Sequence, residues 1–169
     1  MEPTGILTAG FAGLGFQEIL LIAVVAVLLF GGKKIGELLN HNIETVPRMY
    51  PAARRGSYFE RSLRLLAKSR EIAPAITTKS GLMLGLGETF EESCAVLGDL
   101  ASVGVSIVTI GQYLRPSGDQ LPVARFYTPE EFAALKREGM RLGIRHVESG
   151  PLVRSSYHAH EQTTSLTRS

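Results

Sequence analysis

Hydrophobic residues are distributed very differently in the first forty residues and in the rest of the chain. Twelve apolar residues run without a break over Ile19–Phe30, and admitting two polar positions extends the segment back to Phe11. About twenty such residues make a helix that can cross the ~30 Å hydrocarbon core of a bilayer. The pattern predicts one transmembrane helix over residues 11–32. The basic pair Lys33-Lys34 that follows it favours a cytoplasmic location for the rest of the chain.

Two other interpretations of this apolar run fit less well. A secretory signal peptide has basic residues before its apolar segment and a small-residue cleavage site after it. Here the basic pair follows the run, and no such site is present. A helix that packs one side against the core of a small domain keeps a polar face, whereas Val24, Val25 and Val27 are surrounded by apolar residues on every side. A membrane helix is therefore the preferred interpretation.

Beyond residue 40, short apolar segments alternate with capped helices. The pattern predicts extended segments at 41–46, 80–86, 105–110 and 144–147, and helices at about 58–69, 90–102 and 129–142. Thr89 and Thr128 are the predicted N-caps of the last two helices, because each precedes a glutamate at the third helical position. The first helix contains the apolar residues Leu63, Leu65, Leu66 and Ala67. The predicted apolar stripe of the second is Phe90, Leu97 and Ala101, flanked by Val96 and Leu100, and the predicted inward residues of the third are Phe132, Leu135 and Met140.

Strands that alternate with helices in this way predict an α/β fold with a parallel sheet and right-handed crossovers. A complete β/α barrel takes about 250 residues, and roughly 120 are available here. We therefore predict a partial (half) β/α barrel with parallel strands, preceded by one N-terminal transmembrane helix. The predicted domains are residues 1–39, residues 40–158, and a disordered polar tail over residues 159–169.

Composition excludes several classes of function. The 169 residues carry a net charge of +2, which argues against a nucleic-acid-binding protein that depends on a dense basic surface. The single cysteine excludes an internal disulfide and any Cys-x-x-Cys metal motif supplied by this chain. That residue, Cys94, lies within a predicted helix, where a free thiol is usually a small apolar filler.

The loops that follow the carboxyl ends of parallel strands are the usual ligand-binding positions in such folds. Gly85-Leu86-Gly87-Glu88 would let a ligand approach the backbone closely, but it lacks the third glycine of a dinucleotide-binding fingerprint. By itself it is typical of a strand-to-helix turn. Glu44, at another strand end, is more often a structural hydrogen-bond acceptor than a ligand. The other candidates there are Asn42 and Thr45, Gly111-Gln112-Tyr113, and Arg154-Ser155-Ser156-Tyr157.

The N-terminal segment resembles the small membrane subunit of the twin-arginine protein translocase. The resemblance rests on GFQEILLIAVVAVLLFGGKKIGELL, with Gln17 or Glu18 at the polar position of the helix and Phe30-Gly31 at the hinge. It implies a short membrane helix followed by an amphipathic surface helix. In that family the surface helix continues for several turns, whereas here its pattern stops after Glu37-Leu38-Leu39.

Residues 40–159 resemble the C-terminal half of lipoyl synthase. The resemblance rests on NHNIETVPRMYP, TKSGLMLGLGET, TIGQYLRPS, LPVARFYTPEEF and GPLVRSSYHA, in that order. Lipoyl synthases are radical S-adenosylmethionine enzymes that insert two sulfur atoms into a protein-bound octanoyl chain. One [4Fe–4S] cluster cleaves the cofactor and a second provides the sulfur. The implied partner is therefore an octanoylated, lipoyl-bearing carrier protein.

The lipoyl synthase resemblance also implies roles for particular residues. Ser155 or Ser156 would bind the second, auxiliary cluster. The family holds its two clusters with two cysteine triplets, and Cys94 matches neither. We therefore expect this chain by itself to be inactive in sulfur insertion. The residues implied in cofactor binding, or in the loop near the substrate channel, are Asn42, Glu44, Gly85, Gly87, Glu88, Gln112, Tyr113 and Arg115.

Three functional hypotheses remain open at this point. The leading one is a lipoyl synthase-like half enzyme joined near residue 40 to a translocase-type membrane helix, by a genomic rearrangement or by an error of assembly or gene prediction. The second is a membrane-anchored docking or assembly protein whose partner supplies the missing strands and clusters. The third is a working translocase subunit that carries a passenger domain.

Overall fold

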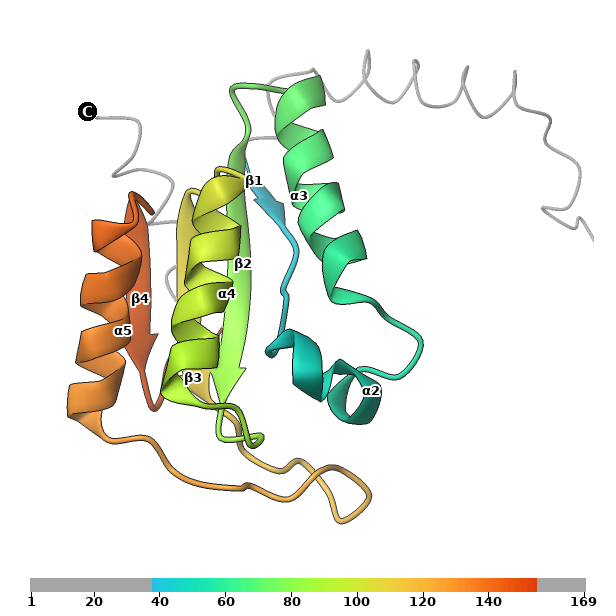
Figure 1. Ribbon diagram of the computed structural model, residues 1–169, viewed down its shortest axis with the longest axis vertical. Coiled ribbons are helices and arrows are strands. Elements are labelled where there is room, and N and C mark those ends of the chain that lie inside the picture. The colour runs from blue at the N-terminus through green and yellow to red at the C-terminus, as the bar shows by residue number, and fades with distance from the viewer. Residues whose placement is uncertain (1–37, 155–169) are drawn as a thin grey trace, which may run out of the picture. The chain divides into compact units, whose positions relative to one another are not determined.

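A four-stranded parallel sheet with helices packed on one face forms the described part of the protein. The computed structural model describes residues 38–154, all within the second of two compact units, residues 37–169. The three longer helices lie side by side in front of the sheet in Figure 1. The strands are β1 (Leu38–Asn40), β2 (Thr77–Leu84), β3 (Ile107–Gln112) and β4 (His146–Gly150), and the helices are η1 (Pro47–Met49, a 3-10 turn), α2 (Tyr50–Ala53), α3 (Phe59–Ile72), α4 (Phe90–Ser102) and α5 (Pro129–Arg141).

The strands pair in sequence order, β1-β2-β3-β4, and every pair is parallel. Each crossover contains a helix, as parallel neighbours require. The register places Gly81 beside Thr109, and Thr109 beside Glu148, so these three residues point to the same face of the sheet. The predicted α/β class and four-stranded parallel sheet are confirmed.

The first strand differs from its prediction. The ladder of β1 covers Leu38–Asn40 rather than residues 41–46, and Pro47 opens the 3-10 turn. The reason is a local irregularity in the backbone. The amide groups of Ile43 and Glu44 both donate to the carbonyl oxygen of Gly81, at 3.1 and 2.9 Å. Two residues therefore oppose one on β2, which interrupts regular pairing as a β-bulge does.

The helix starts agree closely with the sequence. The Thr89 hydroxyl accepts from the Glu92 amide at 3.1 Å, and the Glu92 carboxylate accepts from the Thr89 amide at 2.8 Å. Thr128 and Glu131 make the same reciprocal pair at 3.3 and 2.9 Å. Each box satisfies two amide groups that a helix N-terminus otherwise leaves without partners. Both predicted capping boxes are confirmed, and α4 covers the predicted residues 90–102.

The hydrophobic core lies between the sheet and its helices. One predicted core position is wrong, because Met140 is 49% exposed, and Leu65 in α3 is also 46% exposed. Helix α3 turns its neighbour Leu66 to the sheet, and successive helical residues point about 100° apart. In α5 the residue before Met140, Gly139, is buried instead, and a Cβ added there would lie 2.9 Å from a methyl of Val147. The buried core includes Leu66, Leu82, Leu84, Val96, Leu97, Leu100, Val108, Ile110, Phe132, Leu135 and Val147.

Within residues 38–154, no helix is both long enough and apolar enough to cross a bilayer. The predicted transmembrane helix over residues 11–32 and the predicted disordered tail over residues 159–169 lie outside the described residues.

Candidate functional site

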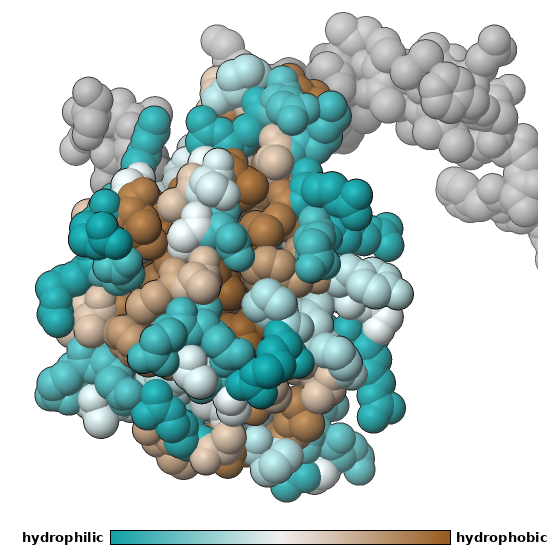
Figure 2. All heavy atoms as spheres, in the orientation of Figure 1, coloured by the Kyte–Doolittle hydropathy of each residue, from teal (hydrophilic) through white to brown (hydrophobic). Residues whose placement is uncertain are grey.

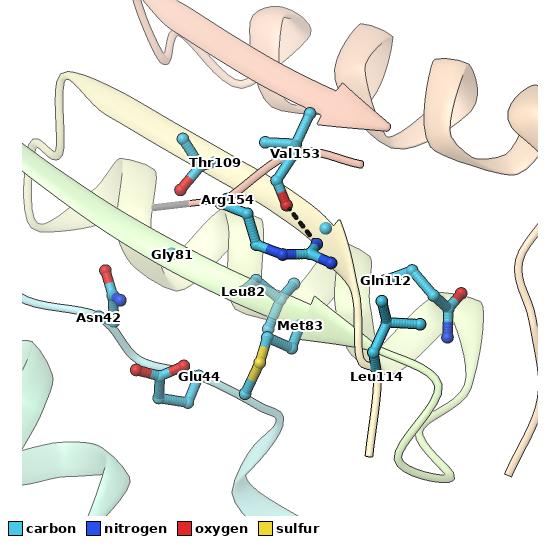
Figure 3. A pocket seen from close by; sticks show the side chains of 11 residues that line it. Asn42, Glu44, Gly81, Leu82, Met83, Thr109, Gln112, Leu114, Val153 and Arg154 are labelled. Carbon is cyan, nitrogen blue, oxygen red and sulfur yellow. Dashed lines mark hydrogen bonds between the residues drawn. The ribbon is translucent and has the colours of Figure 1, made fainter. Parts of the chain in front are cut away.

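A pocket of about 170 Å³ lies against the carboxyl-terminal halves of β2 and β3. On these strands the residues that line it include Gly81, Met83, Thr109 and Gly111, which alternate with the residues that pack against the helices. The pocket therefore opens on the face of the sheet that the helices leave uncovered. Figure 3 shows the segment after β1 along one side of it and the segment after β4 along the other.

Asn42 places an unsatisfied acceptor at this pocket. Its Oδ1 is buried and has no hydrogen-bond partner within the described residues. It lies close to the backbone of β2, where a Cβ added to Gly81 would stand 2.8 Å from it and 3.2 Å from the Thr109 hydroxyl. Only glycine at position 81 leaves room for this amide. A buried polar atom without a partner is costly, so the site suits a ligand that donates a hydrogen bond.

Glu44 lies on the same segment and lines the pocket beside Asn42 (Figure 3). Its φ of 71° is the one positive value among the described non-glycine residues. The strained backbone is held on both sides, because the Glu44 amide donates to Gly81 at 2.9 Å and the Glu44 carbonyl accepts from Met83 at 2.8 Å. Such strain occurs preferentially at functional sites. These two hydrogen bonds therefore fix the position of the Glu44 backbone that carries the carboxylate.

The turn Gly85–Glu88 lies outside the pocket, and its carboxylate is already engaged. Glu88 is 5% exposed, and its two oxygens accept from the amides of Gly85 and Leu86 at 2.6 and 3.0 Å. Gly85 and Gly87 both have positive φ, 104° and 118°, which favours glycine. Within the described residues this segment has the geometry of a strand-to-helix turn, which the hydrogen bonds to the Glu88 carboxylate stabilise.

Gln112 is also engaged with the protein. Its amide nitrogen donates to the carbonyl oxygens of Leu84, Tyr113 and Arg125 at 3.0, 3.2 and 3.1 Å, and its amide oxygen accepts from the Tyr127 amide at 3.0 Å. Figure 3 shows its amide pointing away from the pocket-lining carboxylate and asparagine. The side chain therefore joins the two ends of the long 113–127 loop to β2.

Tyr113 lines a larger cleft, of about 760 Å³, that adjoins the pocket. The two cavities share the lining residues Glu44, Met83 and Leu114, so they adjoin at these side chains. The cleft runs between residues 52–55 and the 113–122 part of the long loop. The Tyr113 hydroxyl donates to the Leu121 carbonyl at 2.9 Å and so closes this part of the loop.

Arg115 is exposed and lines neither cavity. Its guanidinium donates to the carbonyl oxygens of Gln120, at 2.9 Å, and Gly118. Its hydrogen bonds therefore stabilise the loop from the solvent side. Several apolar side chains line the cleft. Those are Ala52, Ala53, Met83, Leu86, Leu114, Pro116, Leu121 and Pro122.

Arg154 brings a cation to the pocket opposite Glu44. It follows β4 and donates to the carbonyl oxygen of Val153 at 2.9 Å, the dashed line in Figure 3. That carbonyl passes so close to β3 that a Cβ at Gly111 would collide with it. Sequence reasoning includes Arg154 only as the neighbour of two serines and omits Gly81 and Thr109. A glycine opposite Asn42 on the next strand is the signal that could have identified position 81.

The predicted cluster ligands Ser155 and Ser156 lie outside the described residues. Between residues 38 and 154 there is no group of three or more His, Cys, Asp or Glu side chains arranged to hold a metal ion. Cys94 lies in α4, partly buried. Burial, and then the nearby carboxylates of Glu138 and Glu91, raise the pKa of its thiol above the usual value. It is therefore a poor thiolate donor where it stands.

Comparison with known proteins identifies relatives of both parts of the chain. The N-terminal part matches a family model described as the mttA/Hcf106 family (TatA_B_E) over residues 11–45. Proteins named lipoyl synthase match most of the chain, with 63% identity over 129 residues for the protein of Koribacter versatilis, and 57% over 132 residues for that of Rubrobacter xylanophilus. Over about three quarters of its length, the chain is homologous to lipoyl synthase. Both resemblances found in the sequence are thereby confirmed.

The lipoyl synthase match covers 76% of this chain and 42% of the Koribacter versatilis protein. A third such protein, from Acidithiobacillus ferrooxidans, is 58% identical over 73% of this chain and 39% of its own length. The chain thus spans about two fifths of the length of the lipoyl synthases that it matches.

Proposed function

We propose that residues 38–154 are the S-adenosylmethionine-facing part of a lipoyl synthase-type barrel, and that sulfur insertion needs further polypeptide to supply the cluster cysteines. The identity of 57–63% to lipoyl synthases supports the first half of this proposal. The single cysteine of the sequence supports the second half. The observation that carries the proposal is the buried, unpartnered oxygen of Asn42 in a pocket on the uncovered face of the sheet.

The polar groups of the pocket fit S-adenosylmethionine. Asn42 and Glu44 offer acceptors suited to the hydroxyl groups of a ribose or to an ammonium group, and Arg154 offers donors suited to a carboxylate. The cofactor carries all three kinds of group. When bound, it supplies the radical chemistry by which this enzyme class acts on an octanoyl chain. The residues of this chain would orient it, and their opposite charges would match its zwitterionic methionyl end.

The described residues do not fit an iron–sulfur cluster. Such clusters are held by thiolates, and Cys94 is the one cysteine of the sequence. It lies in α4, on the helix-covered side of the sheet, and the pocket lining does not include it. We therefore derive no electron transfer and no sulfur donation from this chain. Either step would require cysteines beyond those of this sequence.

The adjoining cleft fits the acyl substrate of such an enzyme. Its apolar lining begins at Met83 and Leu114, which it shares with the pocket, and continues to Leu121 and Pro122. An extended hydrocarbon chain in the cleft would bring its carbon atoms to the boundary between the two cavities. We propose that an octanoyl chain on a carrier protein occupies this cleft during the reaction.

Binding of S-adenosylhomocysteine, measured by calorimetry on the full chain, tests the proposed cofactor pocket. Asn42→Ala is expected to weaken binding about fivefold, the effect of one lost hydrogen bond. Its Oδ1 has no partner in the described part of the protein, so the folded state should tolerate the change. Asn40→Ala, on the exposed end of β1, is the matched control and should bind like the wild type. Equal affinity of all three proteins would refute the assignment of the pocket.

Anaerobic incubation with iron and sulfide tests the missing thiolates. The full chain should show no iron–sulfur charge-transfer absorbance, and it should not add sulfur to an octanoylated carrier domain, as followed by mass spectrometry. A stable, stoichiometric cluster on this chain would overturn the proposal that the cysteines must come from elsewhere.

A second candidate is a membrane-anchored subunit of the twin-arginine translocase type, or a docking protein anchored in the same way. The family match over residues 11–45 favours it. Under this proposal residues 11–32 anchor the chain and the lipoyl synthase-like part lies on the cytoplasmic side. Expression in a strain that lacks the small translocase subunit provides the test, since restored export would support a working subunit and failure to restore it would exclude one.

A further inference from the structure

Basic residues are concentrated in one stretch of the chain. Residues 48–70 hold seven lysines and arginines and one acidic residue, whereas the remaining residues hold 11 basic and 15 acidic ones. The net charge of +2 therefore conceals a strongly basic segment on an otherwise acidic chain. Such an asymmetry produces a local positive potential that attracts acidic partners.

Three of these arginines have bonding partners within the protein. Arg48 pairs with Glu92 at 2.8 Å, and Arg54 donates to the carbonyl oxygen of Asn42 at 3.0 Å. Arg70 donates to the carbonyl oxygen of Gly104. These three arginines connect the segment to the rest of the fold.

The other basic residues of the segment face solvent. Arg55, Arg61 and Arg64 are exposed, and none makes an ion pair or a hydrogen bond with the described residues. Lys68 is exposed too, with a partner of its own at 2.7 Å, Glu71, that is equally exposed. Exposed pairs of this kind are weak and are easily exchanged for another partner.

Helix α3 aligns these charges on one face. It buries Phe59, Ser62 and Leu66 against the core. At about 100° per residue, Arg61, Arg64 and Lys68 therefore point to the opposite side. We call the surface formed by Arg55, Tyr58, Arg61, Arg64 and Lys68 the basic ridge. Figure 2 shows hydrophilic side chains over α3.

An exposed aromatic residue lies within the ridge. Tyr58 is 68% exposed and stands just before the first turn of α3. It lines a shallow depression of about 370 Å³ between α2 and the start of α3. Tyrosine and arginine, together with tryptophan, are enriched at the energetic centres of protein interfaces. An exposed tyrosine among unpaired arginines is thus the composition of a protein-binding surface.

The ridge is continuous with the proposed acyl cleft. Arg54 and Arg55 line both the cleft and the depression that contains Tyr58. A protein seated on the ridge would therefore stand at the mouth of the cleft. A carrier protein has to place its attached acyl chain in that cleft, so the position of the ridge matches the position that a carrier must take.

We propose that the basic ridge docks an acidic face of the carrier protein that delivers the acyl chain. The inference rests on the proposed function, which supplies the acyl substrate. A lipid surface fits the ridge less well, because helices that bind membranes insert an apolar face. Helix α3 buries Phe59 and Leu66 in the core, and its two exposed large apolar residues, Leu65 and Ile72, lie about two turns apart and do not make a continuous apolar face.

Fluorescence anisotropy with an octanoylated lipoyl-accepting domain as the probe tests this proposal on the full chain. Binding should weaken as salt rises from ~50 to ~200 mM. The double variant Arg61→Glu/Arg64→Glu should weaken binding at the lower salt concentration about tenfold and flatten the salt dependence. Tyr58→Ala should weaken binding and leave the salt dependence unchanged, because it removes no charge.

The matched control is Arg137→Glu/Arg145→Glu, which changes the net charge by the same amount. Both arginines are exposed and make no ion pair within the described residues, and they lie in and after α5. The control should bind the carrier domain within about twofold of the wild type. Equal losses in both double variants would show that net charge alone acts, and would overturn the assignment of the ridge.

Two further outcomes would also overturn the proposal. One is the absence of salt-dependent binding of the carrier domain by the wild type. The other is that the ridge variant loses binding to vesicles that contain phosphatidylglycerol but binds the carrier domain as well as the wild type does. S-adenosylhomocysteine binding is measured in parallel, because the ridge variant should leave it unchanged. If the wild type binds S-adenosylhomocysteine but the ridge variant binds the carrier domain as well as the wild type does, this inference alone is refuted. If docking depends on the ridge but the wild type does not bind S-adenosylhomocysteine, the proposed cofactor pocket is refuted.

Discussion

Replacing Gln112 with alanine is expected to destabilise the protein by about 3 kcal/mol. The side chain is 4% exposed and makes four contacts of 3.0–3.2 Å with backbone groups. Its amide nitrogen has two hydrogens, so the contacts amount to about three full hydrogen bonds. Each contributes about 1 kcal/mol net, and the substitution leaves the Tyr127 amide and three carbonyl groups without this partner. The loss should fall on the 113–127 loop, since Gln112 joins both of its ends to β2.

Urea unfolding of the full chain, followed by far-UV circular dichroism, gives the free energy of unfolding of each variant. Gln120→Ala is the control, because Gln120 is exposed in the same loop and its side chain makes no hydrogen bond with the described residues. We expect the control to lie within about 0.5 kcal/mol of the wild type. Limited proteolysis should cut Gln112→Ala faster within residues 113–127 and leave the control unchanged.

The opposite pattern would refute this reasoning. If Gln112→Ala unfolds at the wild-type urea concentration and loses only S-adenosylhomocysteine affinity, the amide is a ligand and the interpretation of a loop clamp is wrong. The comparison is informative because the lipoyl synthase resemblance implies a cofactor-binding role for Gln112.

Three further predictions concern other parts of the fold. Gly111→Ala should destabilise the protein by ~1–3 kcal/mol, because the added Cβ would collide with a backbone carbonyl after β4. Gly98→Ala in α4 has open space around the added Cβ and should stabilise the protein by ~0.5–1 kcal/mol. Thermal unfolding should therefore show shifts of opposite sign for the two variants. Hydrogen bonds from Arg48, and then from the Thr89 amide, lower the pKa of Glu92 from 4.5 to about 2. Because the folded-state pKa is depressed, the stabilisation is present above about pH 4.5 and is lost as the pH falls toward 2, and Arg48→Met should flatten this part of the stability curve in urea titrations. Burial raises the pKa of Cys94, so iodoacetamide at neutral pH should modify it much more slowly in the folded chain than in urea, as mass spectrometry would reveal; equal rates would contradict its partly buried position.

Local signals in the sequence were reliable where short-range physics decides the structure. The capping boxes of Thr89 and Thr128 fixed the starts of α4 and α5, because their hydrogen bonds join residues three positions apart. The strand order followed from alternating strands and helices, since short crossovers permit few other topologies. The buried face of α3 was not identified from the sequence, because several neighbouring leucines allow more than one helical phase.

The sequence identified some residues of the candidate site correctly, but not which of them are free to bind a ligand. Asn42 and Glu44 were identified by their position at a strand end and by the lipoyl synthase resemblance, and the structure brings both to the pocket. Glu88 and Gln112 were identified by the same rule together with a family resemblance, and the structure shows their polar atoms bonded to backbone groups. The type of residue at a strand end does not reveal whether its hydrogen-bonding capacity is already used.

The sequence by itself determined the α/β class, the parallel strand order, both capping boxes and the likeness to lipoyl synthase. Each of these depends on neighbouring residues or on a continuous pattern of residue types. Only the tertiary structure decided that Gly81 makes room for the Asn42 amide, that Arg154 faces the same pocket as Glu44, and that Arg55 connects the cleft to the basic ridge. These are contacts between segments distant in sequence, and pairing and packing of the whole sheet set their distances.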